Sequence, residues 1–125
     1  MNIEGIGSDI VETRRIKKAI QRQKEVFIKR IFTADEISYS KRYKDSFIHF
    51  AGRFAAKEAV VKALGTGFSS KISWQDISIS NDEKGKPQVN FSERINKLFN
   101  TPQILLSISH CQEYAMAVAI LIKIN

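Results

Sequence analysis

Residues 46–64 carry the strongest helical pattern in this chain of 125 residues, and the other elements have to be arranged around it. The run is dense in alanine, the residue with the highest helix propensity. Gly65-Thr66-Gly67 follows it directly, and glycine commonly ends a helix on its C-terminal side. The sequence therefore predicts a long central helix over residues 46–64.

Shorter elements are expected on both sides of this helix. Thr33 and Glu36 have the spacing of a capping box, which predicts a short helix from Thr33 to about Tyr43. Periodicity predicts helices at residues 13–31 and 92–99, and strands at residues 2–10, 76–80, 87–91, 104–109 and 114–124. Because no linker, repeat or low-complexity segment interrupts the chain, we expect a single α+β domain over residues 1–125, with an antiparallel sheet packed against the central helix.

Polar residues of the central helix fall on two different sides. His49, Arg53 and Lys57 are spaced by four and form one polar stripe. Glu58 and Lys62 lie about 160° away among apolar neighbours, where a carboxylate and an ammonium are unfavourable unless they are paired or bound. They form either a simple i,i+4 ion pair at a helix edge, or a site in which Glu58 holds a cation and Lys62 holds a phosphate.

Asp9 is a second candidate acid. It follows Gly7-Ser8 at the end of an apolar strand, so it is a turn residue, a helix N-cap, or a carboxylate that lies near Glu58. In the last case, two carboxylates together with phosphate oxygens and water would form the oxygen shell that Mg2+ prefers.

The segment 107–110 ends another predicted strand. Ser107 and Ser109 share one strand face, and His110 is either structural or a hydrogen-bond donor to a phosphate. The sequence contains no Gly-x-Ser-x-Gly elbow, no Walker A loop, no Gly-x-Gly-x-x-Gly run and no Cys/His set for zinc. These residues therefore do not indicate a serine hydrolase or a zinc site.

Basic charge is concentrated in one segment. The chain has a net charge of +7 and a pI near 9.7, and residues 14–30 contain eight basic residues and one acid, Glu25. Such a segment is either a solvated helix face or a docking surface for a polyanion such as nucleic acid, an anionic membrane or an acidic protein. A nucleic-acid-binding module would carry more aromatic residues among the bases, and it would leave Asp9 and Glu58 unexplained.

The expected location is the cytoplasm. Cys111 is the only cysteine, which excludes an intrachain disulfide and suits a reducing compartment. The first residues lack the basic and apolar regions of a secretory signal. The most apolar stretch, residues 114–122, is much shorter than the roughly 20 residues that cross a membrane, so no membrane partner is expected.

Five motifs in order resemble the short, holo-acyl-carrier-protein synthase type of 4'-phosphopantetheinyl transferase. They are GIGSDIVE at residues 5–12, FAGRFAAKEAVVKALGTG at 50–67, WQDI at 74–77, GKP at 85–87 and SISH at 107–110. Any one tripeptide is weak, but the central run is highly specific, and the ordered set spans nearly the whole chain. The resemblance implies the 4'-phosphopantetheinyl transferase fold.

The resemblance also assigns roles to individual residues. Asp9 and Glu58 would bind Mg2+, and Lys62 would contact a phosphate or orient Glu58. Glu58, directly or through a metal-bound water, would receive the proton of the attacking serine. The residues that would hold coenzyme A are Arg53, Lys62, Gly85, Lys86, Pro87, Ser109 and His110.

The implied reaction transfers the 4'-phosphopantetheine group of coenzyme A to a serine of apo-acyl carrier protein and releases adenosine 3',5'-bisphosphate. It would depend on Mg2+ and support fatty acid biosynthesis. Carrier proteins are acidic, so the basic helix would dock them through Arg14, Arg15 and Arg22. The resemblance further implies a homotrimer with active sites at subunit junctions. An inactive trimeric scaffold is the alternative, and the complete set of metal-ligand motifs argues against it.

Overall fold

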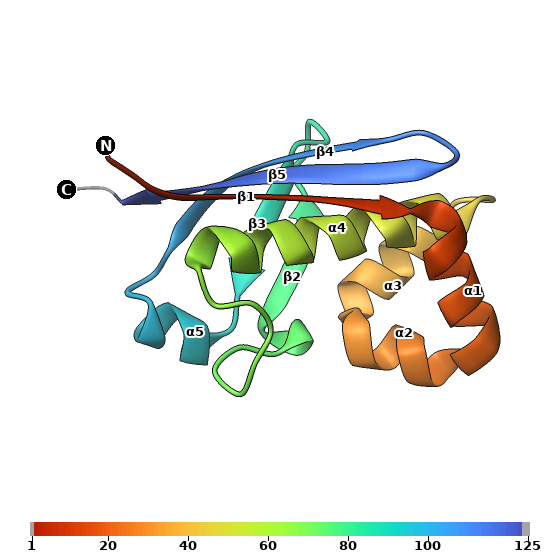
Figure 1. Cartoon of the computed structure of the whole chain (residues 1–125), viewed down its shortest axis with the longest axis horizontal. Coiled ribbons are helices and arrows are strands. Elements are labelled where there is room, and N and C mark those ends of the chain that lie inside the picture. The colour runs from red at the N-terminus through yellow and green to blue at the C-terminus, as the bar shows by residue number, and fades with distance from the viewer. Residues whose placement is uncertain (1, 124–125) are drawn as a thin grey trace.

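The computed structural model describes residues 2–123, and in it the helix α4 (Ser46–Leu64) runs along one face of a three-stranded antiparallel sheet (Figure 1). The sheet order is β1 (Asn2–Glu12), β5 (Tyr114–Lys123), β4 (Gln103–His110), so the last strand lies in the middle. The expected α+β class, with an antiparallel sheet against a long central helix, is confirmed. Ile124, which the sequence placed in the last strand, lies outside the described residues.

A second layer covers other parts of α4. It contains the helix α3 (Ala34–Lys41), a 3-10 turn at Trp74–Asp76, the hairpin of β2 (Ile77–Asn81) and β3 (Pro87–Phe91), and the helix α5 (Glu93–Leu98). Figure 1 shows α5 near one end of α4 and α3 near the other. Within residues 2–123, no helix is long and apolar enough to span a bilayer.

The single helix expected at residues 13–31 is wrong, because the chain breaks at Lys24. The break has φ 52° and ψ −130° and separates α1 (Thr13–Gln23) from α2 (Glu25–Ile31). Ile16 of α1 is 4% exposed and Ile31 of α2 is also 4% exposed. The change of direction lets both apolar faces reach the same core, a tertiary effect that helical spacing alone does not reveal.

Small residues bring β1 into direct contact with α4. Ala55 and Ala59 of the helix are fully buried, and a Cβ atom added to Gly7 would overlap the carbonyl oxygen of Ala59 and come within 2.8 Å of Lys62 Cβ. Gly5 meets the carbonyl oxygen of Ala63 in the same way. The two glycines of β1 are therefore needed for the close approach that sets the position of the rest of the strand.

The polar stripe of α4 is largely covered by other elements, with Arg53 and Lys57 both buried. Lys57 is fully buried, and its Nζ lies 2.8 Å from Glu36 Oε1 and donates to the carbonyl oxygen of Ile31 at 2.8 Å. The other carboxylate oxygen of Glu36 accepts from the backbone N–H of Ile79 at 2.7 Å. Because α4 is covered by the sheet on one side and by α3 and β2 on the other, Lys57 of this stripe lies in an internal ion pair.

The capping box is confirmed and is part of the same cluster. The side chain of Thr33 accepts from the backbone N–H of Glu36, while the Glu36 carboxylate accepts from the backbone N–H of Thr33 at 2.8 Å. Glu36 therefore caps α3, holds β2 and neutralises Lys57 with one carboxylate. This arrangement fixes α3 against α4 near Arg53.

Candidate active site

The contact between β1 and α4 places Asp9 beside the Glu58 side of the helix. Lys62 Nζ lies 3.1 Å from Asp9 Oδ1 and donates to the carbonyl oxygen of Ser8 at 2.9 Å. The Lys62 ammonium thus joins α4 to β1. The ion pair with Glu58 inside the helix, one of the two alternatives left by the i,i+4 spacing, is replaced by a pair with Asp9. The Asp9 side chain is only 17% exposed, so this charge pair is partly withdrawn from water.

Glu58 lies in an environment that disfavours its charge. Burial raises the pKa of the Glu58 carboxyl, the nearby charge of Asp9 raises it further, and Lys62 opposes both effects. Two carboxylates close enough to repel each other are stabilised when a cation binds between them. The electrostatics of this pair therefore suit a divalent cation.

A cavity of about 330 Å³ opens at the two carboxylates, lined by Asp9, Glu58, Phe54, Arg15 and neighbouring apolar residues. Among residues 2–123, no group of three or more His, Cys, Asp or Glu side chains could hold a metal ion. A cation here would have two protein carboxylates and would complete its shell with phosphate oxygens and water. Mg2+ is commonly bound in that way, so the residues present fit it.

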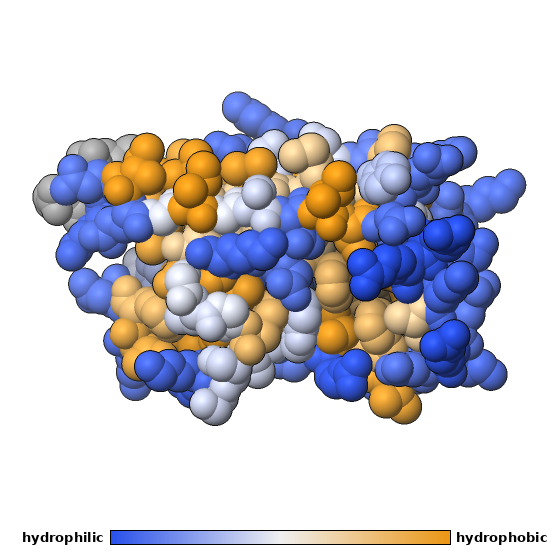
Figure 2. All heavy atoms as spheres, viewed as in Figure 1, coloured by the Kyte–Doolittle hydropathy of each residue, from blue (hydrophilic) through white to orange (hydrophobic). Residues whose placement is uncertain are grey.

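The basic helix lies against this cavity. Arg15 lines it. The Arg14 side chain is 73% exposed, and its Nη2 atom lies 3.6 Å from Glu12 Oε2. Arg22 is exposed in the last turn of α1. Figure 2 shows hydrophilic side chains covering the end of the molecule that contains α1. A protein bound to this basic end would reach the carboxylate cavity directly.

Arg53 lines a second cavity, of about 150 Å³, on another side of α4. His110, Gly85 and Pro87 also line it, and it shares no lining residue with the carboxylate cavity. Arg53 is only 4% exposed, yet its Nε and Nη2 atoms have no hydrogen-bond partner. Buried donors of a guanidinium are nearly always paired, so these atoms indicate a place for an anion.

Aromatic rings surround Arg53, and those of Tyr39 and Tyr43 were not among the candidate site residues. The guanidinium carbon lies 4.0 Å from the centre of the Tyr39 ring. His49 stacks on Tyr43 at 3.7 Å between ring centres, and its ring centre is 5.4 Å from that of His110. The sequence signal was the four-residue step from His49 to Arg53, but nothing local indicated that Tyr39 of α3 and Tyr43 after it would lie beside these residues.

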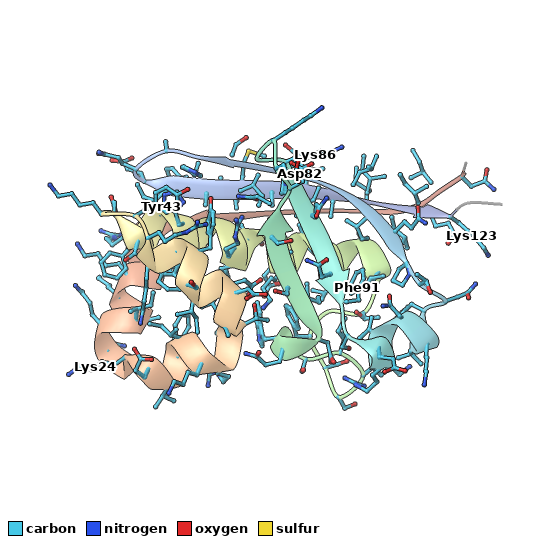
Figure 3. All side chains as sticks on the ribbon, turned by 180° about the vertical axis from the view of Figure 1, so that it is seen from behind. Lys24, Tyr43, Asp82, Lys86, Phe91 and Lys123 are labelled. Atoms are coloured by element: carbon cyan, nitrogen blue, oxygen red, sulfur yellow. The ribbon has the colours of Figure 1, made fainter. Side chains whose placement is uncertain are left out.

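Three of the expected coenzyme-binding residues lie away from the Arg53 cavity, namely Lys62, which pairs with Asp9, and Lys86 and Ser109. Lys86 lines a different cavity between β3 and β4, and its backbone N–H donates to Asp82 Oδ1 at 2.9 Å. Figure 3 shows Lys86 and Asp82 at the tip of the β2–β3 hairpin. Ser109 is exposed, and because strand side chains alternate, it faces away from the side of His110.

Comparisons with known proteins agree on one family. The model of the 4'-phosphopantetheinyl transferase superfamily matches residues 5–119. A holo-acyl-carrier-protein synthase of Protochlamydia amoebophila is 53% identical over 116 residues, which cover 93% of this chain and 95% of the relative.

Solved structures of the same kind of protein are similar throughout. The holo-acyl-carrier-protein synthase of Neisseria meningitidis is 31% identical, with a TM-score of 0.89, and the match covers 98% of this chain and 100% of the relative. That of Helicobacter pylori, solved in complex with coenzyme A, is 38% identical, with a TM-score of 0.86, and the match covers 93% and 98% of the two chains.

Proposed function

Because the chain belongs to the 4'-phosphopantetheinyl transferase superfamily and, within it, to the holo-acyl-carrier-protein synthases, we propose that it transfers the 4'-phosphopantetheine group of coenzyme A to a serine of an apo-acyl carrier protein. The observation that carries this proposal is the pair of cavities on different sides of α4, of which one suits a cation that can bind a phosphate and the other suits an anion. One contains the Asp9 and Glu58 carboxylates and the other contains the buried guanidinium of Arg53. Coenzyme A carries a diphosphate, which suits a cation held by the two carboxylates, and a phosphate monoester on its ribose, which suits the guanidinium.

Asp9 and Glu58 are the proposed ligands of Mg2+, and the ion, when bound, would neutralise the diphosphate of coenzyme A and polarise the phosphorus under attack. Lys62 would then donate to a phosphate oxygen. The serine oxygen forms a bond to the β-phosphorus, and the bond from that phosphorus to the oxygen of the leaving adenosine 3',5'-bisphosphate breaks. Glu58, directly or through a water molecule, would receive the serine proton.

Arg53 and His110 are the proposed partners of the phosphate monoester on the coenzyme A ribose. A doubly charged monoester would satisfy the unpaired Nε and Nη2 atoms of Arg53 in a way that a neutral group cannot. Gly85 and Pro87 border the same cavity, which suits the proposed contact of this loop with the nucleotide. Lys86 and Ser109 have no place at this cavity within one chain.

A homotrimer with active sites at subunit junctions is proposed for the assembly. The outer face of the three-stranded sheet exposes apolar side chains, among them Ile6 at 69%, Ile10 at 66% and Leu105 at 49%, and Figure 2 shows apolar side chains exposed along β1. A patch of this kind commonly marks a protein interface. The two cavities face different sides of α4, so one coenzyme molecule would join the carboxylates of one subunit to the Arg53 cavity of its neighbour.

Carrier-protein docking is proposed for the basic surface of α1, through Arg14, Arg15 and Arg22. Its position beside the carboxylate cavity supports this, because an acidic partner held there would present its serine to Asp9 and Glu58. The product, holo-acyl carrier protein, would serve fatty acid biosynthesis in the cytoplasm.

The direct test is to mix the protein with apo-acyl carrier protein, coenzyme A and Mg2+ and to measure the intact mass of the carrier. We expect the carrier to gain one phosphopantetheine group and adenosine 3',5'-bisphosphate to appear in equal amount. EDTA should stop the reaction, and added Mg2+ should restore it. An unchanged carrier mass with several acyl carrier proteins would refute the proposed function.

A further inference from the structure

The Arg53 cavity contains a side chain for which the proposed function has no role. His49 lies on α4 one turn before Arg53 and lines the cavity together with Arg53 and His110. The residues that complete the lining are Tyr39, Gly52, Asn81, Gly85, Pro87 and Ile108, so no carboxylate faces this space. Three basic side chains, one guanidinium and two imidazoles, therefore line one small cavity that no carboxylate lines.

The His49 ring is stacked through one of its faces. One face stacks on Tyr43, with 3.7 Å between ring centres and 18° between planes. The ring meets Tyr39 and His110 nearly at right angles, at 5.7 Å and 5.4 Å between centres. Because stacking uses a ring face and both nitrogens lie in the ring plane, the contact with Tyr43 does not prevent the nitrogens from donating a hydrogen bond.

We propose that His49 is a further phosphate-binding residue of the Arg53 cavity, acting beside Arg53 and His110, and that Tyr43 holds its ring in place. The proposal rests on the proposed function in one respect, namely that this cavity takes the phosphate monoester of coenzyme A. A dianion placed among Arg53, His49 and His110 would pair with the buried guanidinium and lie beside two imidazoles whose ring centres are 5.4 Å apart.

Proton uptake should accompany this binding. In the free protein, burial lowers the pKa of His49. The nearby charges of His110 and Arg53 lower this pKa further, whereas the charge of Asp45 raises it. The groups that face the ring are Arg53 from α4, His110 from β4, Tyr39 from α3, and Tyr43 and Asp45 from the segment that precedes α4. A bound dianion raises the pKa of His49, so its contribution to affinity is full below the free-protein pKa and is lost as the pH rises through the bound-state pKa.

The experiment is calorimetric titration of the full-length protein with adenosine 3',5'-bisphosphate and, separately, with adenosine 5'-monophosphate, which lacks the 3'-phosphate. His49→Phe keeps an aromatic ring against Tyr43 but removes both nitrogens. We expect this variant to bind the bisphosphate about tenfold more weakly, as for loss of one charge-assisted hydrogen bond, and the monophosphate less than about twofold more weakly. His49→Gln should recover part of the affinity through its neutral donor.

The pH profile separates binding from packing. Above pH 6.5 the phosphate monoester is largely a dianion, so the affinity gain of the native protein between about pH 8 and pH 6.5 should be larger than that of His49→Gln. Lys41→Gln is the matched control, because it removes a positive charge from α3 outside the cavity, where Lys41 pairs with Glu25. It should change both affinities by less than about twofold. Light scattering checks that all variants form the same assembly.

Two results would overturn the role of His49. One is a His49→Phe variant that binds the bisphosphate as tightly as the native protein, which would make the ring a packing element. The other is an equal loss for both nucleotides, which would mean that the 3'-phosphate is not its ligand. The carrier-mass assay on the native protein is independent, so a failure of transfer refutes the proposed function and leaves these binding results to be judged alone.

Discussion

Replacing Lys57 by methionine should destabilise the protein strongly without touching the site of chemistry. Lys57 and Glu36 form a fully buried ion pair, with both side chains at 0% exposure. Lys57→Met keeps the volume and leaves the Glu36 carboxylate buried without its cation. Removing one partner of such a pair costs about 3–5 kcal/mol. For a chain of 125 residues this corresponds to a fall in Tm of roughly 10–20 °C.

The assay is urea unfolding followed by circular dichroism at one fixed protein concentration, because assembly would couple stability to concentration. Lys97→Met is the matched control, since Lys97 pairs with Glu93 at 3.2 Å with side chains 77% and 84% exposed. That pair should contribute at most a few tenths of a kcal/mol.

The double variant Glu36→Gln, Lys57→Met tests the pairing itself. It should be more stable than the sum of the two single losses predicts, by about 1 kcal/mol or more, because the second change removes the charge that the first one left unpaired. A loss below about 1 kcal/mol for Lys57→Met alone would refute the buried pair as the link between α4 and α3.

The remaining predictions concern transfer and docking. Asp9→Ala or Glu58→Ala should lower transfer with Mg2+ by about 100-fold or more at unchanged unfolding midpoint, and near-native turnover in either variant would remove that residue from the metal site. Lys62→Ala should lower kcat by roughly 10-fold or more. The loss of stability should be small, because the Lys62 side chain is 49% exposed. A mild effect on kcat would mean that Lys62 is only the ion-pair partner of Asp9. Charge reversal to Glu at the three arginines of α1 should raise KM for the carrier protein by roughly tenfold, most strongly at low salt, with kcat nearly unchanged. An unchanged KM would contradict docking. Tight, salt-sensitive binding of nucleic acid by the native protein would favour the nucleic-acid alternative. The residues to reverse are Arg14, Arg15 and Arg22.

Much of the fold could be predicted because the local signals were strong. The helix over residues 46–64 begins and ends where the alanine-rich run and Gly65 indicated, and the capping box at Thr33 and Glu36 forms as the spacing required. The five ordered motifs identified the family, which the comparisons confirm. The roles assigned to Asp9, Glu58 and Arg53 remain proposals, now with a geometry that supports them.

What the sequence left undetermined has one cause, which is that a local pattern does not say what covers an element. The spacing of His49, Arg53 and Lys57 indicated one polar stripe, but it did not indicate that α3 and β2 cover the helix there and make Lys57 a core residue. Helical spacing through residues 13–31 could not reveal the break at Lys24, because both halves keep the same period.

The sequence by itself determined the helix α4, the antiparallel α+β class, the family and the types of side chain available for chemistry, because propensity, capping and motif order act over short distances. Only the tertiary structure decided that Lys62 pairs with Asp9, that Glu36 neutralises Lys57, and that His49, Tyr39 and Tyr43 surround Arg53. These contacts join residues from different elements, and they depend on how closely β1 and α3 pack against α4. That distance is set by Gly7 and by the buried Glu36 carboxylate, whose partners become known only when the chain is folded.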